Sequence, residues 1–285
     1  MPDVGFIGLG LLGSAITERL LAAGYDVVGF DVDPTCRQRF EAHGGRCGDS
    51  AADVVAQAPL VILSLPDSGI VAQVLGEIES VAAGKRFVDT TTGDPQSAIA
   101  AGQRLAGCGA RYVEATVIGS SRMLRERDVV VLIGGEPEDA AAAAPFVDVW
   151  SKQRFHVGPL GSAAKAKLVA NLVLGLNRAV LAEGLTLAIR SGLDGAAMLE
   201  VLRSGLAYSR VMDTKGRKML ESDFDPEARL RQRQKDVRLI LELGAEHGAR
   251  LPLSELHDRL LSRAESLGFA DADNSAIIRA IQEPE

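Results

Sequence analysis

A glycine-rich turn near the N-terminus is the feature that most limits how this chain can fold. The order along the chain is an apolar run Val4–Gly8, the turn Gly8-Leu-Gly10-Leu-Leu-Gly13, an amphipathic stretch to about Ala23, a second apolar run Asp26–Phe30, and Asp31. Strand, GxGxxG, helix, strand and acid in this order are typical of a dinucleotide-binding βαβ unit. Gly8 permits a tight turn, Gly10 lets the backbone approach a pyrophosphate, and Gly13 allows close helix–strand packing. The helix N-terminus offers unpaired N–H groups to the phosphates.

Asp31 bears on which dinucleotide binds. A carboxylate at the end of the second strand accepts hydrogen bonds from ribose hydroxyls and repels a 2′-phosphate. Arg37 and Arg39 follow a few residues later, and we interpret them as exposed residues of the next helix rather than as phosphate ligands. The sequence therefore predicts NAD, with NADP as the alternative.

Further short apolar runs predict a parallel sheet. They are Leu60–Leu65, Arg86–Asp89, Arg111–Val117, Val129–Gly134 and Arg154–Val157. Ligands of a doubly wound sheet bind at the carboxyl ends of its strands. We therefore expect cofactor contacts at Leu65, Pro66 and Asp67 and at the threonines that end with Thr92. The turn Gly119-Ser120-Ser121 presents N–H and hydroxyl donors suited to a substrate carboxylate, although an ordinary tight turn explains it equally well.

A long helix is predicted between Gly158 and Gly192, a stretch without proline after its first residues. Its Leu168–Leu176 segment is apolar on nearly every side, which is typical of a buried helix. Lys167 and Asn171 lie four residues apart and share one helix face, which Arg178 extends, whereas Lys165 lies about 200° around the axis from Lys167. A buried ammonium is costly without a partner or a chemical role. The alternative is that Lys167 reaches the surface and Asn171 satisfies a backbone group.

The remainder of the chain predicts helices alone. They are Ala196–Ser204, Ser209–Leu220, Pro226–Gly248, Leu253–Leu267 and Asn274–Ile281, separated by glycine and proline. The predicted fold is α/β, with an N-terminal doubly wound Rossmann-type domain over residues 1–160 and an all-α C-terminal domain over residues 161–285. The long interdomain helix joins the two.

Composition narrows the classes of partner. A net charge of −7 without a basic run argues against a nucleic-acid surface. The three cysteines and four histidines lack metal-site spacing, so we expect no metal. The start of the chain has no signal-peptide pattern, and we find no apolar run of the roughly 18 residues that span a bilayer. We therefore expect a cytoplasmic protein without a membrane partner. Small residues in the long helix, Gly175, Ala179, Ala182 and Gly184, are suited to a subunit interface.

Six motifs in order resemble the β-hydroxyacid dehydrogenase family. They are FIGLGLLG (Phe6–Gly13), LPDS (Leu65–Ser68), DTTTGDP (Asp89–Pro95), EATVIGSS (Glu114–Ser121), GPLGSAAKAKLVAN (Gly158–Asn171) and QKDVRL (Gln234–Leu239). The family includes 3-hydroxyisobutyrate dehydrogenase and tartronate semialdehyde reductase and is related to 6-phosphogluconate dehydrogenase. The resemblance covers essentially the whole chain, and it implies a homodimer or homotetramer.

The resemblance implies an oxidoreductase that transfers hydride reversibly between NAD and the 3-hydroxyl carbon of a small 3-hydroxy acid. It assigns Lys167 as the acid/base, and Asn171 one turn later as a substrate ligand. A free lysine has a pKa of about 10.4, which burial beside other cations would lower. The substrate residues implied are Gly119, Ser120, Ser121, Lys167 and Asn171. The cofactor residues predicted from the motifs and the resemblance are Gly8, Leu9, Gly10, Leu11, Leu12, Gly13, Asp31, Val32, Leu65, Pro66, Asp67, Thr92 and Lys235.

Two departures from the family pattern leave alternatives open. Leu12 stands where the family usually has methionine, which should matter little. Ile118 replaces a serine of the substrate loop, so no particular family substrate is carried over. One alternative is a reductase of tartronate or succinic semialdehyde that works mainly with NADPH. Another, from a different class, is a dinucleotide-binding sensor without turnover, against which the Lys167–Asn171 pair argues. Lys167 also counts against imine reduction.

Overall fold

The protein forms two compact units in the computed structural model, which describes residues 2–283. The units are Met1–Lys167 and Leu168–Glu285. The division falls inside one continuous helix, α8 (Ser162–Arg190), a few residues beyond the domain boundary expected from the sequence. The long interdomain helix of the sequence prediction is therefore present, and its first turn and a half belongs to the first unit.

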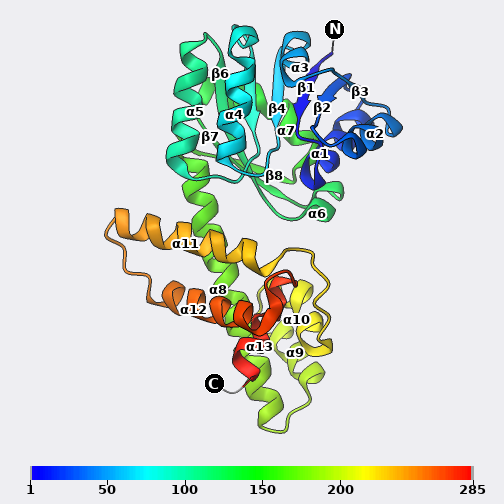
Figure 1. Ribbon diagram of the computed structural model, residues 1–285. Helices are drawn as coiled ribbons and strands as arrows, with labels where there is room; N and C mark the ends of the chain where they lie inside the picture. The colour runs from blue at the N-terminus through cyan, green and yellow to red at the C-terminus, as the bar shows by residue number, and fades with distance from the viewer. Residues whose placement is uncertain (1, 284–285) are drawn as a thin grey trace. The chain divides into compact units, whose positions relative to one another are not determined.

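The first unit is built on one eight-stranded sheet in the order β3-β2-β1-β4-β5-β6-β7-β8 (Figure 1). The strands are β1 (Val4–Ile7), β2 (Val27–Phe30), β3 (Arg46–Cys47), β4 (Leu60–Leu63), β5 (Arg86–Asp89), β6 (Arg111–Ile118), β7 (Val130–Gly134) and β8 (Gln153–Gly158). Neighbouring strands are parallel except for β6 and β7. This is the doubly wound arrangement that the sequence predicted. The edge strand β3 was not expected, because two residues carry no periodic pattern.

Helices cover both faces of this sheet, because successive side chains of a strand point to opposite faces. Val88 of β5 packs in the core with α1, α2, α6 and α7, whereas its neighbour Phe87 packs in the core with α3, α4 and α5. The helices are α1 (Leu11–Ala22), α2 (Pro34–Ala42), α3 (Ala51–Gln57), α4 (Ser68–Ile78), α5 (Pro95–Gly107), α6 (Ser121–Arg125) and α7 (Pro137–Trp150). The carboxyl ends of β1, β4, β5 and β6 lie along one edge of the sheet, so the turns predicted to bind ligands share that edge.

The second unit is all-helical, as predicted. Its elements after α8 are α9 (Gly195–Ser204), α10 (Val211–Glu221), α11 (Leu230–Glu246), α12 (Pro252–Ala264), η2 (Glu265–Phe269), η3 (Asn274–Ala276) and α13 (Ile277–Gln282). Leu185 of α8, Val237 of α11 and Leu261 of α12 share its core. The helix expected from Pro226 begins only at Leu230, because the backbone N–H groups of residues 227 and 228 donate to the carboxylate of Asp273 instead.

One face of α8 is exposed, contrary to the expectation of a helix buried on every side. Val169 is 59% exposed, Val173 52%, Val180 70% and Leu187 70%. By length and composition, α8 is the one helix among residues 2–283 that could cross a membrane. Polar residues interrupt this segment, so no single apolar run of that length marks it in the sequence. Core helices of soluble proteins meet the same criterion.

Candidate functional site

The glycines of the first turn have three different surroundings. Gly8 has a φ of +97°, and a Cβ there would lie 2.2 Å from the carbonyl oxygen of Ser64. A Cβ at Gly13 would lie 1.9 Å from the carbonyl oxygen of Gly8. Around Gly10 no atom lies within 4 Å of the Cβ position. Gly8 and Gly13 are therefore required by packing, whereas Gly10 leaves the turn open to an approaching group.

The open turn leads into a helix N-terminus without a side-chain cap. Gly10 is the N-cap of α1, and no side chain bonds to the first N–H groups of that helix. Asp31 fixes the turn, since its Oδ2 accepts from the N–H of Leu9 at 2.6 Å and its Oδ1 from the N–H of Asp33 at 2.9 Å. Leu11 is 77% exposed and Val32 85%. An open glycine, uncapped N–H donors, a carboxylate and exposed apolar side chains together fit a dinucleotide, with the phosphates at α1 and the adenosine at Asp31.

Arg37 lies closer to this site than the sequence suggested. Its Nη1 donates to the carbonyl oxygen of Asp31 at 2.6 Å, and its guanidinium lies 5.7 Å from the ring centre of Phe30. Arg37 is half-buried, whereas Arg39 is exposed and donates to the sulfur of Cys36. The sequence analysis interpreted both arginines as exposed residues of the helix that follows Asp31, which is confirmed for Arg39 and wrong for Arg37. A cation beside Asp31 makes the adenosine end compatible with either NAD or NADP.

Two of the three threonines after β5 have structural bonds. The hydroxyl of Thr90 donates to the carbonyl oxygen of Leu63, and that of Thr91 accepts from the N–H of Leu65. Thr92 is half-exposed, so it is the threonine best placed to meet a ligand. In the neighbouring turn Pro66 is exposed, and Asp67 caps α4 through the N–H of Ile70. Asp67 therefore has a structural role that does not require a cofactor.

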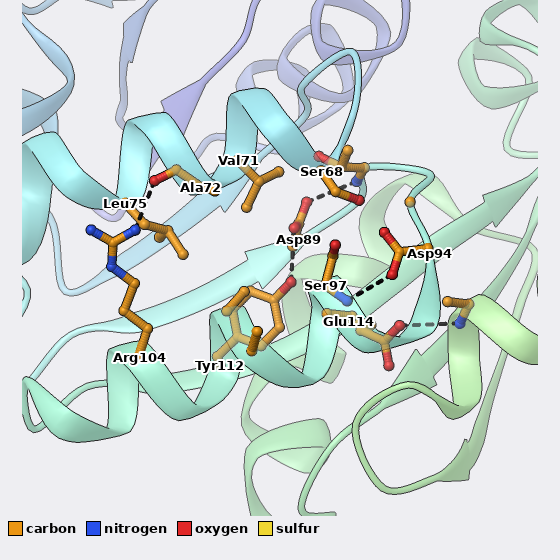
Figure 2. A pocket seen from close by; sticks show the side chains of 16 residues that line it. Ser68, Val71, Ala72, Leu75, Asp89, Asp94, Ser97, Arg104, Tyr112 and Glu114 are labelled. Carbon is orange, nitrogen blue, oxygen red and sulfur yellow. Dashed lines mark hydrogen bonds between the residues drawn. The ribbon is translucent and has the colours of Figure 1, made fainter.

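A cavity of about 160 Å³ lies between α4 and α5, and none of the predicted site residues lines it. Figure 2 shows Asp89 and Tyr112 meeting in its wall, where the tyrosine hydroxyl donates to Asp89 Oδ2 at 2.8 Å. Burial raises the pKa of Asp89, although hydrogen bonds from Thr91 and Tyr112 oppose the shift. Burial also raises the pKa of Tyr112. Sequence analysis missed this pair, because an acid at a strand end also fits ordinary turn chemistry.

Lys167 reaches the carboxyl end of β6. Its side chain is 9% exposed, and its Nζ donates to the carbonyl oxygen of Val117. Gly119, two residues on, has a φ of +146°, and a Cβ there would lie 2.5 Å from Val129. Ser120 caps the short helix α6, which begins at Ser121. The structure thus brings the predicted acid/base to the strand that leads into the predicted substrate turn.

Glu114 anchors the start of α8 and was not singled out by the sequence analysis. Its carboxylate accepts from the N–H groups of Gly161 at 2.6 Å and Ala164 at 3.1 Å. Burial raises the pKa of Glu114, while these backbone N–H groups oppose the shift. A Cβ at Gly134 would lie 2.4 Å from Glu114 Oε2, so that glycine makes room for the carboxylate. The available signal was an acid inside the apolar run of β6.

Asn171 is fixed within the second unit by Asp236, a role that the sequence analysis missed. The amide nitrogen of Asn171 donates to Asp236 Oδ2 at 3.2 Å, and Nη1 of Arg233 donates to the same oxygen at 2.9 Å. Asn171 is 5% exposed. The neighbouring Lys235 is exposed and lies on a face of α11 with Arg238. Its predicted contact with a cofactor stays a prediction.

Comparisons with known proteins find similarity along nearly the whole chain. Residues 3–158 match a family model described as the NAD binding domain of 6-phosphogluconate dehydrogenase, and residues 161–281 match one described as NAD-binding of NADP-dependent 3-hydroxyisobutyrate dehydrogenase. Glyoxylate/succinic semialdehyde reductase 1 of Arabidopsis thaliana is 31% identical over 284 residues, which cover 98% of each chain. Human cytokine-like nuclear factor N-PAC is 31% identical over 281 residues, 97% of this chain and 51% of that protein. The structure of 3-hydroxyisobutyrate dehydrogenase from Mycobacterium tuberculosis with L-serine superposes with a TM-score of 0.90 at 25% identity, over 99% of this chain and 100% of that one.

Proposed function

The chain belongs to the β-hydroxyacid dehydrogenase family, and from that premise we propose that it oxidises a small 3-hydroxy acid reversibly at the 3-hydroxyl carbon. It is an NAD(P)-dependent oxidoreductase that acts on CH–OH groups. The observation that carries the proposal is the ammonium of Lys167, buried and bonded to the carbonyl oxygen of Val117 just before the Gly119–Ser121 turn.

The residues of the chain handle the proton and the substrate. A bound nicotinamide supplies or accepts the hydride. In the reductive direction Lys167 donates a proton to the developing alkoxide, and in the oxidative direction it takes the hydroxyl proton. Val117 holds the amino group at one place, which lowers the cost of orienting it. The Gly119–Ser121 turn binds the substrate carboxylate, and Asn171, oriented by Asp236, binds the hydroxyl.

Replacing Lys167 by alanine tests this assignment. We expect kcat to fall by about 10²- to 10⁴-fold, the usual contribution of a positioned acid/base, while the affinity for the dinucleotide measured by fluorescence titration is unchanged. Lys165→Ala is the matched control, because Lys165 is half-exposed and lies on another face of α8. A Lys167→Ala enzyme with turnover near that of the control would show that the lysine does not carry the proton.

Reduction of a small semialdehyde with NADPH is the second candidate. The half-buried guanidinium of Arg37 beside Asp31 favours it, because a cation there can pair with a 2′-phosphate. The similarity to glyoxylate/succinic semialdehyde reductase 1 supports the same substrate class. A panel of serine, 3-hydroxyisobutyrate, 4-hydroxybutyrate, glycerate and threonate with NAD and NADP, together with glyoxylate and succinic semialdehyde with NADH and NADPH, separates the two. The preferred pair is the one with the highest kcat/KM.

A homo-oligomer formed through α8 is part of the proposal. The exposed residues are Val169, Val173, Val180 and Leu187. They are spaced by four, seven and seven residues, so they form one stripe along the helix. A stripe with this spacing is suited to packing against another helix. A second copy of the chain offers the same stripe, and a two-fold axis would pair the two.

A further inference from the structure

The amide of Asn171 is held by two side chains of α11. Its Nδ2 donates to Asp236 Oδ2 at 3.2 Å, and Nη1 of Arg233 donates to the same oxygen at 2.9 Å. All three residues belong to the second unit. Arg233 and Asp236 lie three residues apart on α11, so the helix itself brings their side chains together. Arg233 therefore holds the carboxylate that holds the amide.

The carboxylate of Asp236 decides which end of the amide faces it. A carboxylate only accepts hydrogen bonds, whereas an amide group has a donating nitrogen and an accepting oxygen. The nitrogen of Asn171 must therefore face Asp236, and its Oδ1 is turned away from that carboxylate. Without a fixed acceptor, rotation about the last side-chain bond would exchange the two ends of the amide, because that torsion is broad and nearly two-fold.

The place of Arg233 is unfavourable for stability. It lies in the first turn of α11, where the partial positive charge of the helix N-terminus disfavours a cation. Nε of Arg233 and two donors of Arg178, Nε and Nη1, are buried without an acceptor among residues 2–283. Burial, and then the charge of Arg233, lower the pKa of Arg178 to about 9, so the two guanidinium groups repel each other. A neutral side chain would avoid these costs, which indicates that Arg233 contributes something beyond the stability of α11.

We propose that Arg233 is a positioning residue for the reaction: through Asp236 it fixes the orientation of the Asn171 amide toward the substrate oxygen. The inference rests on the proposed function, which assigns Asn171 to the substrate hydroxyl. Arg233 acts through its neighbours and needs no contact with the substrate. A misoriented amide costs rate rather than dinucleotide affinity, because its contact is with the reacting oxygen.

Steady-state kinetics of Arg233→Met, with the substrate that the panel selects, test the proposal. We expect kcat to fall by about 10- to 100-fold, the cost of a misplaced contact near the reacting atoms. KM should stay within about twofold of wild type, since the lost contact acts mainly in the transition state. Arg233→Lys should restore most of kcat, because a single N–H donor is enough for one carboxylate oxygen.

Arg203→Met is the matched control. Arg203 also forms a pair with an acid three residues away on a helix of the second unit, Glu200, at 2.9 Å. Its side chain is 38% exposed, and it has no part in the assigned site. We expect this variant to keep the kcat of the wild type.

A double-mutant cycle separates positioning from a general loss of structure. In the Asn171→Ala background the amide is gone, so Arg233→Met should lower kcat no further. Equal fold-losses of kcat in the wild-type and Asn171→Ala backgrounds would overturn the proposal. So would an Arg233→Met enzyme with the kcat of Arg203→Met.

A crystal structure of the wild type tests the contacts without a variant that must fold. Arg233 directed away from Asp236, or an Asn171 amide that does not contact that carboxylate, would overturn the positioning role and leave the proposed function untouched. Absence of wild-type turnover with every substrate of the panel would instead refute the proposed function, and the positioning role with it.

Discussion

At the scale of single residues, several buried polar and charged groups of this protein are held by specific hydrogen-bond partners. Lys167 is held by a backbone carbonyl, Asn171 by Asp236, and Glu114 by backbone N–H groups at the start of α8. All three of these residues are buried. In a medium of low polarity their orientation depends on these partners, because an unpaired buried polar group is costly.

The pH dependence of the unfolding free energy should reveal the raised pKa of the buried Glu114 carboxyl group. Burial raises its pKa above the ordinary 4.5, so the folded chain keeps a proton that the unfolded chain has released. The stability from this group is complete below about pH 4.5 and falls as the pH rises through the folded pKa. The unfolding free energy of wild type minus that of Glu114→Gln should therefore be largest in acid and shrink toward pH 8.

Chemical denaturation across this pH range measures the difference. Glu138→Gln is the control, since Glu138 is exposed in the first turn of α7. We also expect Glu114→Gln to be less stable by about 1–3 kcal/mol in acid, because the NH2 group of glutamine cannot accept from a backbone N–H, whereas both oxygens of the protonated carboxyl group can. A difference that grows as the pH rises would contradict the assigned direction of the shift.

At the scale of elements, a buried ion pair ties three segments of the second unit together. Lys215 of α10 bonds to Asp273, just before η3, at 2.9 Å and to Glu227, just before α11, at 3.0 Å. Asp273 is 0% exposed, and its Oδ2 also accepts from the N–H groups of residues 227 and 228. Burial alone would raise the pKa of Asp273, but the hydrogen bonds from Lys215 and Ser275 lower it overall. The pair therefore sets where α11 begins.

Removing one partner of this pair should be strongly destabilising. Lys215→Met leaves the carboxylate of Asp273 buried without its cation, which costs about 3–5 kcal/mol in comparable proteins. Lys218→Met, one turn later, removes a pair with the exposed Asp223 and should cost less than about 1 kcal/mol. Urea unfolding of both variants measures these costs. Equal losses of unfolding free energy would mean that the buried pair stabilises the protein no more than the exposed pair does.

At the scale of the whole molecule, the exposed stripe of α8 is an apolar surface that the chain does not cover within residues 2–283. Burying an exposed valine or leucine is worth about 1.5–3 kcal/mol, so a stripe of four can hold two chains together. Val180→Glu places a charge near the middle of the stripe, and in light scattering it should convert the proposed oligomer to single chains. Leu206→Glu, a fully exposed leucine outside the stripe, should leave the mass unchanged. A wild-type protein that is already monomeric would rule out this interface.

Much of the fold was predictable because its signals are local. The GxGxxG turn depends on glycine conformations, and strands and helices follow from residue periods of two and 3.6. The same helical period is enough to place Lys167, Asn171 and Arg178 on one face of α8. The parallel sheet follows from βα units of ordinary length. These features need only neighbouring residues, so the amino-acid order alone determined them.

The hydrogen-bond partners of Glu114, Lys167 and Asn171 came only from the tertiary structure. Glu114 bonds across 47 and 50 residues to the start of α8, Lys167 across 50 residues to Val117, and Asn171 across 65 residues to Asp236. No periodic pattern joins positions so far apart, because their meeting depends on how sheet and helices pack. The exposed side of α8 and the unpaired donors of Arg178 could not be predicted for the same reason, since burial is a property of the packed chain and not of the residue.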